Sequence, residues 1–431
     1  MKAGRNVSSY WRDIFLQASG NTIAQAIGIL GIPLLARLYT PQDFAVQNIF
    51  LQLVMFFSGV MTWRYEYFFQ MLRSEQQARS LLLGVAKLGF VTGVILTFIM
   101  YFFSAEIAKV LSLQSGEKWL VIAPLSAFFV SIALAFQHNA QREGSYKISA
   151  LSEVFGKSSY VISGALLAFV SGSGLVLTTL FSALGKIASI VLYSKTLFGT
   201  RAKSSACTSS PLKEHAHGAH ALVVSHLLVT MSSAAPIFFI SAAYGAEVLG
   251  QFSMVLATIF LPSGLIGAAI GQVFYQRAAS HHLEPMLLRS LWRLTVRRLA
   301  IFGIPIYLGA AILAPYLYPL VLGGQWHDAG AYAQLLAIGA LCAFISTPLD
   351  RISLVLRFNF YMPLLHVLRL VLTVGVILIA KYYGLIFRDF LILYVAQVSA
   401  VYLLDLIFAR ILIAMAIEKS AATLGKEKEG L

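Results

Sequence analysis

The longest polar stretch of the chain reads Lys195-Thr-Leu-Phe-Gly-Thr-Arg-Ala-Lys-Ser-Ser-Ala-Cys-Thr-Ser-Ser-Pro-Leu-Lys-Glu-His-Ala-His-Gly218. It carries four cations, Lys195, Arg201, Lys203 and Lys213, against the single acid Glu214. About six apolar segments precede it and about six follow it, each long enough for a membrane helix. This arrangement predicts a cytosolic hinge, residues 198–217, between an N-terminal lobe, 1–197, and a C-terminal lobe, 218–431.

The composition excludes an ordinary soluble domain. The chain has 431 residues, of which 58% are hydrophobic and only 12% are charged, whereas soluble domains carry about 25% charged residues. The alternating segments of about ten residues that mark a membrane β-barrel are absent from the sequence. We therefore expect an all-α polytopic membrane protein with about twelve transmembrane helices. Their expected ranges are 14–35, 44–63, 81–103, 119–136, 148–170, 174–196, 219–243, 248–270, 299–322, 331–356, 361–383 and 388–415.

The net charge of +14 is explained by where the basic residues lie. If the N-terminus is cytosolic, 23 of the 32 Lys and Arg residues fall in segments on the cytosolic side and five fall outside. The remaining four, Lys87, Lys157, Lys186 and Arg369, lie within helices. Lys and Arg accumulate in the cytosolic loops of membrane proteins. The distribution predicts a multi-pass protein with both termini in the cytosol, and it removes the case for nucleic-acid binding.

Cysteine and histidine give no chemistry of their own. Cys207 and Cys342 are the two cysteines, too few for a disulfide framework or a cysteine-based metal site. His215, His217 and His220 are better explained as part of a solvated hinge than as a metal tract. The sequence therefore predicts no metal, no cofactor and no catalytic residue.

Two local patterns predict helix boundaries and surface contacts. Pro41 and Asp43 suit the first turn of a helix. Arg289, Arg293 and Arg297 recur every four residues opposite Leu287, Leu291 and Leu294. That spacing predicts a helix lying on an anionic membrane surface, ahead of the helix at 299–322.

The two halves share a weak internal repeat. Asp43-Phe-Ala-Val-Gln47 opens one helix of the first half, and Glu247-Val-Leu-Gly-Gln251 opens the corresponding helix of the second half. Many transporters are built from such repeats. The repeat supports two lobes of six helices around a central cavity.

Several motifs, in order over nearly the whole chain, resemble the bacterial polysaccharide-biosynthesis and O-antigen flippases of the multidrug/oligosaccharidyl-lipid/polysaccharide exporter superfamily. The motifs are Arg37-Leu-Tyr-Thr-Pro-Gln-Asp-Phe44, Arg64-Tyr-Glu66, Gln141-Arg-Glu-Gly-Ser-Tyr-Lys-Ile148, Tyr244-Gly-Ala-Glu-Val-Leu-Gly-Gln-Phe252, Leu261-Pro262, Gly271-Gln-Val-Phe-Tyr-Gln-Arg277, Trp326-His-Asp-Ala-Gly330 and Ser346-Thr-Pro-Leu349. Where that family usually has small apolar residues after Arg-Tyr-Glu, this chain has Tyr67, Phe68 and Phe69.

The resemblance implies a transporter of the bacterial inner membrane and not an enzyme. It implies a cavity that opens alternately to each side and a cargo of oligosaccharide on polyprenyl pyrophosphate, moved from the cytosolic to the periplasmic leaflet. Membrane lipids would be further partners, and the resemblance allows a polysaccharide polymerase, the chain-length machinery and a coupling proton or sodium ion.

Charged residues within the predicted helices are the candidate site. Lys157, Lys186, Arg369 and Asp405 each lie about 12–15 Å from the cytosolic ends of their helices at 1.5 Å per residue. Cations at this depth would lower the barrier to an anionic pyrophosphate. The alternative is internal pairing, of Glu153 with Lys157 and of Arg369 with Asp405.

A second set of charged residues lies at helix ends. Arg64 is a further candidate for the pyrophosphate, and Glu66, Glu153, Asp350 and Asp405 are candidates for coupling or gating. For Arg64 and Glu66, and equally for Asp350 and Arg351, the alternative is an ion pair that anchors a helix end. His226 and His366 could carry protons or could be core histidines with satisfied hydrogen bonds.

Three other functions remain open from the sequence. A drug or cation antiporter of the same superfamily would be expected to bury more acid than base, and here base dominates. A membrane polysaccharide polymerase or ligase would carry a large periplasmic loop, but the longest outside loop, Ser104–Lys118, has no catalytic cluster. A peptidoglycan-precursor flippase would also carry a pyrophosphate.

Overall fold

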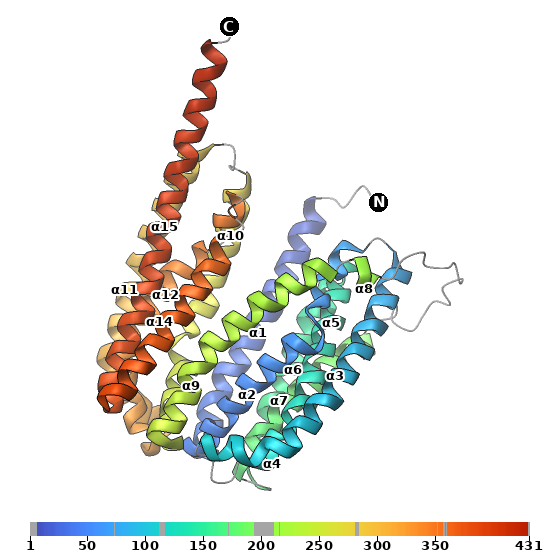
Figure 1. Ribbon diagram of the computed structural model, residues 1–431, viewed down its shortest axis with the longest axis vertical. Helices are drawn as coiled ribbons and strands as arrows, with labels where there is room; N and C mark the ends of the chain where they lie inside the picture. The colour runs from blue at the N-terminus through green and yellow to red at the C-terminus, as the bar shows by residue number, and fades with distance from the viewer. Residues whose placement is uncertain are drawn as a thin grey trace. The chain divides into compact units, whose positions relative to one another are not determined.

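The computed structural model describes residues 7–72, 74–111, 117–170, 172–193, 211–214, 216–280, 284–350, 352–356, 358 and 360–429. It forms two compact units, Met1–Gly250 and Gln251–Leu431. The described chain is helical, without a strand, so the all-α expectation is confirmed (Figure 1). Most of the expected hinge lies outside the described residues. The expected division into two lobes and a hinge therefore stays a prediction.

The first unit contains seven long helices and several short ones. Their bounds are α1 Val7–Leu38, α2 Pro41–Met61, the 3₁₀ helix η1 Tyr65–Met71, α3 Glu75–Val110, α4 Glu117–Leu120, α5 Ala123–Arg142, α6 Tyr146–Leu167, η2 Gly172–Leu177, α7 Thr178–Tyr193, α8 Pro211–Glu214 and most of α9 Ala216–Ile259. Helix α6 packs between α1 and α7, and α5 packs against α2, α3 and α7.

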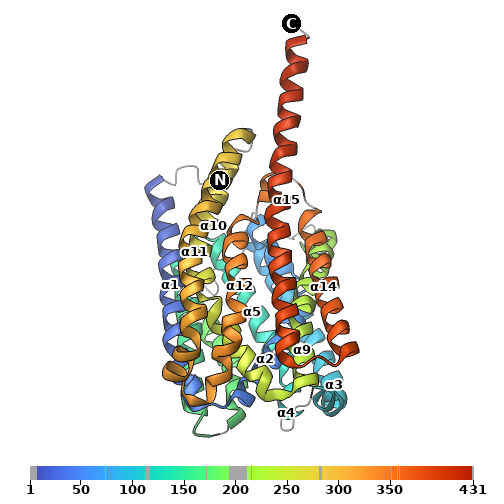
Figure 2. The same ribbon diagram turned by 90° about the vertical axis from the view of Figure 1, so that its left-hand side faces the viewer.

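The second unit begins within α9. Its elements are the π-helix η3 Ser263–Gly267, α10 Ala268–Ser280, α11 Pro285–Leu322, η4 Gly324–Trp326, α12 His327–Ser346, η5 Thr347–Leu349, α13 Ile352–Val355, α14 Tyr361–Tyr383 and α15 Phe387–Glu429. Helix α12 packs against α11 and α15, and α14 packs against α15. Within this unit α15 extends past the ends of α12 and α14 (Figures 1 and 2).

Ten segments of the described chain are long and apolar enough to cross a membrane. The difference from the expected twelve has two causes. The expected helices 219–243 and 248–270 fall in one continuous segment, Ala216–Gly267, which is broken at Gly245 (φ 88°, ψ 167°). The expected helix 148–170 forms as α6, but its charged residues and serines keep it outside the ten.

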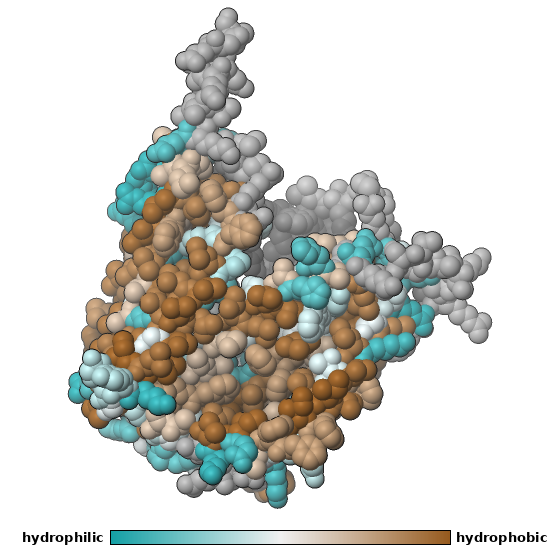
Figure 3. All heavy atoms as spheres, in the orientation of Figure 1, coloured by the Kyte–Doolittle hydropathy of each residue, from teal (hydrophilic) through white to brown (hydrophobic). Residues whose placement is uncertain are grey.

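Exposure of the apolar helices identifies their solvent. The apolar windows of α3 and α14 have mean hydropathies of 2.1 and 2.2, yet only 11% and 6% of their residues are buried. The less apolar α2, at 1.7, is 56% buried. Soluble proteins bury their most apolar segments. In α3 and α14 this order is reversed, and hydrophobic side chains cover much of the face drawn in Figure 3, as expected of a protein surrounded by lipid.

Capping explains where two helices begin. Thr40 and Asp43 form a capping box ahead of Pro41, which confirms the expected start of α2. Ser74 and Gln77 form a second capping box, so α3 begins at Glu75.

The segment with Arg289, Arg293 and Arg297 is not a separate helix ahead of 299–322, as we had expected. Residues 285–322 form one continuous helix, α11. The buried face of its first turns carries Leu288 and Trp292, which pack with Phe274 of α10 and Ile413 of α15, whereas Leu287 and Leu294 are exposed. The apolar stripe was misplaced by one residue because leucines occur on both faces of this segment.

Candidate functional site

A charged cluster joins α5, α6 and α7 in the first unit. The Glu153 carboxylate pairs with the Lys186 ammonium at 2.8 Å and accepts a hydrogen bond of 2.9 Å from the Gln137 amide. Lys186 passes over Gly156, where a Cβ would come within 2.6 Å of the Lys186 Cγ. The missing side chain at Gly156 therefore makes room for this ion pair.

Lys157 lies next to this cluster without a carboxylate of its own. In the described part of the chain, no carboxylate oxygen lies within 4.0 Å of its ammonium. Its Nζ atom lies 5.8 Å from the centroid of the Tyr160 ring, and its Cδ atom would lie 3.7 Å from a Cβ at Gly28 of α1. The expected pairing of Glu153 with Lys157 was wrong, because Lys186 reaches the same carboxylate from the facing helix. The Lys157 ammonium is therefore left without an ion-pair partner among the described residues.

The second unit holds a buried carboxylate on α15. Asp405 is 5% exposed and accepts hydrogen bonds from the hydroxyls of Ser346 on α12 and Tyr361 on α14. No Lys or Arg ammonium or guanidinium in the described residues lies within 4.0 Å of it. Hydroxyl donors, not a cation, therefore satisfy this carboxylate.

Arg369 of α14 lies over an aromatic ring. Its Cζ atom is 4.8 Å from the centroid of the Tyr402 ring on α15. Such a contact is worth up to about 2 kcal/mol when it is desolvated. The expected ion pair of Arg369 with Asp405 is not formed. The guanidinium lies over the Tyr402 ring instead, and the Asp405 carboxylate accepts its hydrogen bonds from two hydroxyl groups. The π-cloud of Tyr402 does not neutralise the guanidinium charge.

The two units repeat the same plan internally. In each unit a carboxylate and a cation lie on two neighbouring helices, α6 and α7 in the first unit and α15 and α14 in the second. A polar side chain of an earlier helix bonds to the carboxylate: Gln137 of α5 to Glu153, and Ser346 of α12 to Asp405. The glutamines of the short repeat behave alike. Gln47 and Gln251 are both 3% exposed; the Gln47 amide donates to the Tyr160 hydroxyl at 2.6 Å and the Gln251 amide to the Gln325 carbonyl at 2.6 Å.

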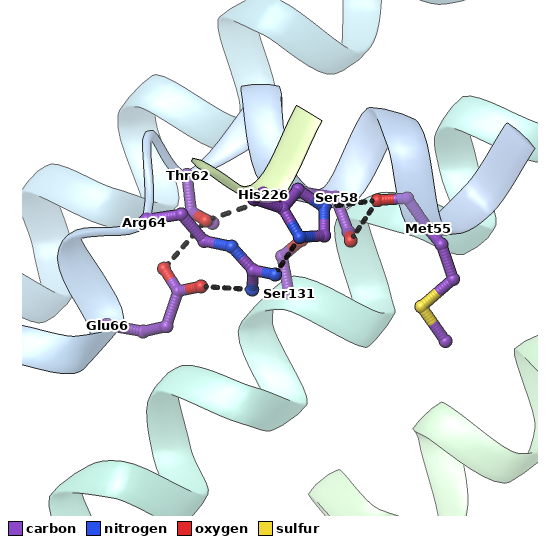
Figure 4. A network of polar contacts seen from close by, with 7 residues as sticks. All are labelled: Met55, Ser58, Thr62, Arg64, Glu66, Ser131 and His226. Atoms are coloured by element: carbon purple, nitrogen blue, oxygen red, sulfur yellow. Dashed lines mark hydrogen bonds and ion pairs between the residues drawn. The ribbon is translucent and has the colours of Figure 1, made fainter. Parts of the chain in front are cut away.

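Arg64 and Glu66 form the third group, at the turn after α2 (Figure 4). The Arg64 guanidinium pairs with Glu66 at 3.1 Å, and the Thr62 hydroxyl donates to Glu66 at 2.7 Å. The other side of the guanidinium contacts the imidazole of His226 on α9. Glu66 is 1% exposed, and breaking a buried pair by removing one partner costs about 3–5 kcal/mol. The anchoring pair of Arg64 and Glu66 is thus present, and it includes a histidine of another helix.

The backbone of this turn is strained. Trp63 (φ 52°) and Arg64 (φ 59°) are the non-glycine residues with positive φ in the described chain. The left-handed conformation costs about 1–2 kcal/mol for each such residue. The neighbouring contacts of both side chains with α9 help to hold this conformation.

Asp350 lines a cavity of about 480 Å³ in the second unit. The other walls include Ser263 and Gly267 of the π-helix, Pro348, and Tyr402. Tyr402 therefore lines the cavity and also contacts the Arg369 guanidinium. Arg351 lies outside the described residues.

Several residues that contact the charged side chains were not predicted from the sequence. Tyr361, Ser346 and Tyr402 are ordinary residues of apolar helices, and their contacts come from helices far apart in the sequence. Gln137 could have been noticed, because a glutamine within an apolar helix needs a partner. Within the described chain no group of three His, Cys, Asp or Glu side chains could hold a metal ion.

Solved structures with similar folds are transporters. An inward-facing multidrug resistance MATE family transporter of the MOP superfamily aligns with a TM-score of 0.59 and 15% identity, over 93% of this chain and 96% of that one. A MATE protein in complex with MaL6 gives 0.64 and 14%, over 94% and 97%. A MOP superfamily transporter from Pyrococcus furiosus gives 0.55 and 14%, over 94% and 96%. The chain therefore shares the fold of these transporters.

The family follows from the sequence itself. The family model described as "Polysaccharide biosynthesis protein" matches residues 34–331, more than half of the chain. The chain belongs to this family. No curated protein sequence matches the chain significantly.

Proposed function

We propose that this transporter flips an oligosaccharide linked to polyprenyl pyrophosphate from the cytosolic to the periplasmic leaflet of the bacterial inner membrane, for surface polysaccharide assembly. The observation that carries the proposal is Lys157, an intramembrane cation with no carboxylate partner in the described chain. Family membership supports the same function.

The physical reason is the charge of the cargo. A pyrophosphate is multiply anionic and cannot enter hydrocarbon without compensation. Two unit charges 4 Å apart attract by about 4 kcal/mol at an effective dielectric of 20. Lys157 and Arg369 each lie within a helix, one per unit, and neither is neutralised by an ion pair. They would hold the pyrophosphate, and Lys186 would contribute through the pair that it shares with Glu153.

The experiment is direct. Deleting the gene from its bacterium should abolish surface polysaccharide and leave lipid-linked oligosaccharide on the cytosolic leaflet. The purified protein in liposomes should then move a fluorescent polyprenyl-pyrophosphate oligosaccharide between leaflets. Normal surface polysaccharide in the deletion strain, together with inactive liposomes, would exclude this function.

A drug or cation antiporter is the second candidate, and Asp405 is the observation that favours it. A buried carboxylate bonded only to hydroxyls can exchange a proton for a cation. The same liposomes should then drive efflux of a cationic dye under a proton gradient. We expect dye efflux to be absent and oligosaccharide movement to be present.

A further inference from the structure

Two histidines of α9 bind the strained turn after α2. The His226 Nε2 atom lies 2.9 Å from the Met55 carbonyl oxygen, and its Nδ1 atom contacts the Arg64 guanidinium (Figure 4). The His220 Nδ1 atom lies 2.8 Å from the Trp63 indole nitrogen. The residues bound are Trp63 and Arg64, the consecutive pair with left-handed backbone.

The chemistry of these partners determines the protonation of both rings. An indole N–H and a guanidinium can only donate hydrogen bonds, and a carbonyl oxygen can only accept them. His226 must therefore carry its hydrogen on Nε2 and present a lone pair at Nδ1. His220 must likewise present a lone pair at Nδ1. Both contacts require a neutral imidazole.

Protonation would break both contacts. An imidazolium has an N–H on each nitrogen, so His220 would meet the Trp63 indole hydrogen and His226 would meet the positive guanidinium of Arg64. Glu66 is the acid that faces this site from the turn, and it is already engaged by Arg64 and Thr62. From α5, the imidazole of His138 lies beside the Tyr67 ring, tilted to it, with 5.1 Å between the ring centroids, and it supplies no negative charge.

Apolar packing holds this part of α9 as well. Ala219 is fully buried and belongs to the cluster that contains Tyr65 and Phe68 of η1, and α9 approaches α2 closely at Gly59, where a Cβ would overlap the His226 ring. The two histidines add polar contacts to this packing, directly at the strained turn.

We propose that His220 and His226 form a proton-binding latch: neutral, they fasten α9 to the Trp63–Arg64 turn, and protonated, they release it. Histidine is the side chain whose charge changes between about pH 5 and 8, so the latch would couple the freedom of α9 to proton concentration. The latch proposal does not depend on which cargo the protein carries, and its test measures the protein without any cargo.

The test is hydrogen–deuterium exchange of α9 in lipid nanodiscs at about pH 7.5 and about pH 5.5, corrected for the intrinsic effect of pH. Hydrogen bonds of this kind are strong enough that we expect the protection of residues 216–226 to fall about tenfold on acidification. In the double variant His220→Asn/His226→Asn the fall should be absent, since the asparagine carbonyl accepts a hydrogen bond and cannot be protonated.

Three further measurements sharpen the result. His217→Asn is the matched control, because His217 is an exposed residue of the same helix; its variant should keep the native response. Trp63→Phe removes a donor and should lower protection already at the higher pH. Nitrogen-15 NMR spectra of the histidine side chains, assigned with the variants, should show at the higher pH that both imidazoles are neutral and carry no hydrogen on Nδ1. An unchanged pH response in the double variant, or an Nδ1-protonated ring, would overturn the latch.

Discussion

Single residues decide how charge is arranged inside the helices. Lys157 and Lys186 lie on adjacent helices, yet only Lys186 reaches the Glu153 carboxylate. Arg369 faces a ring and Asp405 faces two hydroxyls. The net effect is positive charge that no carboxylate of the described residues neutralises, and this is the charge that the proposed pyrophosphate cargo would require.

Lys157→Gln should lower export of surface polysaccharide by about tenfold or more, because one unit-charge contact at an effective dielectric of 20 is worth about 4 kcal/mol. Export is measured as surface polysaccharide per amount of transporter in the membrane. The control is Lys87→Gln, since Lys87 is an exposed residue of α3. Full export by Lys157→Gln would remove this lysine from the site.

Arg369→Ala should also reduce export, and Arg369→Lys should retain part of it, because an ammonium keeps the charge but loses the planar fork. The structure separates this role from pairing with Asp405. If Arg369 served only to neutralise Asp405, the double variant Arg369→Ala/Asp405→Ala would recover export. We expect the double variant to stay defective, again at equal protein level.

At the scale of elements, the corner within α9 sets the direction of two successive helical segments. Gly245 adopts φ 88° and ψ 167°, a region open almost only to glycine. Beyond this corner Gly250 lies against the backbone of Pro41, and the Gln42 amide donates to Glu247 at 2.8 Å. The corner is thus fastened to the first turn of α2.

Gly245→Ala should destabilise the protein by about 1–3 kcal/mol, the cost of a side chain in this backbone region. Gly375→Ala is the matched control: it lies within α14, and a Cβ there meets nothing within 4 Å. Because alanine favours a helix over glycine by about 1 kcal/mol, the control should be neutral or stabilising. Thermal unfolding in detergent measures both, and equal midpoints for the two variants would contradict the strain argument.

At the scale of the whole molecule, the two units share a plan of helices and polar contacts, and the fold is that of a two-lobe transporter. The orientation in the membrane is carried by the basic residues. A reporter fused after Phe198 and another after Glu429 should both give a cytosolic signal, since the orientation with cytosolic termini is the one that places 23 of 32 Lys and Arg residues in the cytosol. A periplasmic signal from either fusion would refute the topology.

The hinge is tested in the same molecule by limited proteolysis. Residues 198–217 are rich in Ser, Ala and Lys and lack an apolar stripe. In detergent they should be cut first, and the two fragments should remain associated. Earlier cleavage elsewhere, with this segment intact, would count against a hinge.

Local composition was enough to predict the all-α membrane fold, the start of α2 at Pro41 and the candidate residues themselves, because burial in lipid and helix capping depend on neighbouring residues along the chain. Partners could not be predicted in this way. Lys186 rather than Lys157 takes Glu153, Tyr402 takes Arg369, and His226 meets Arg64 across 162 positions of sequence. Such contacts depend on which faces of separate helices meet. Which faces meet is determined by helix packing at glycines such as Gly59 and Gly156, where the absence of a side chain leaves room for a residue of another helix. Only the tertiary structure shows this packing.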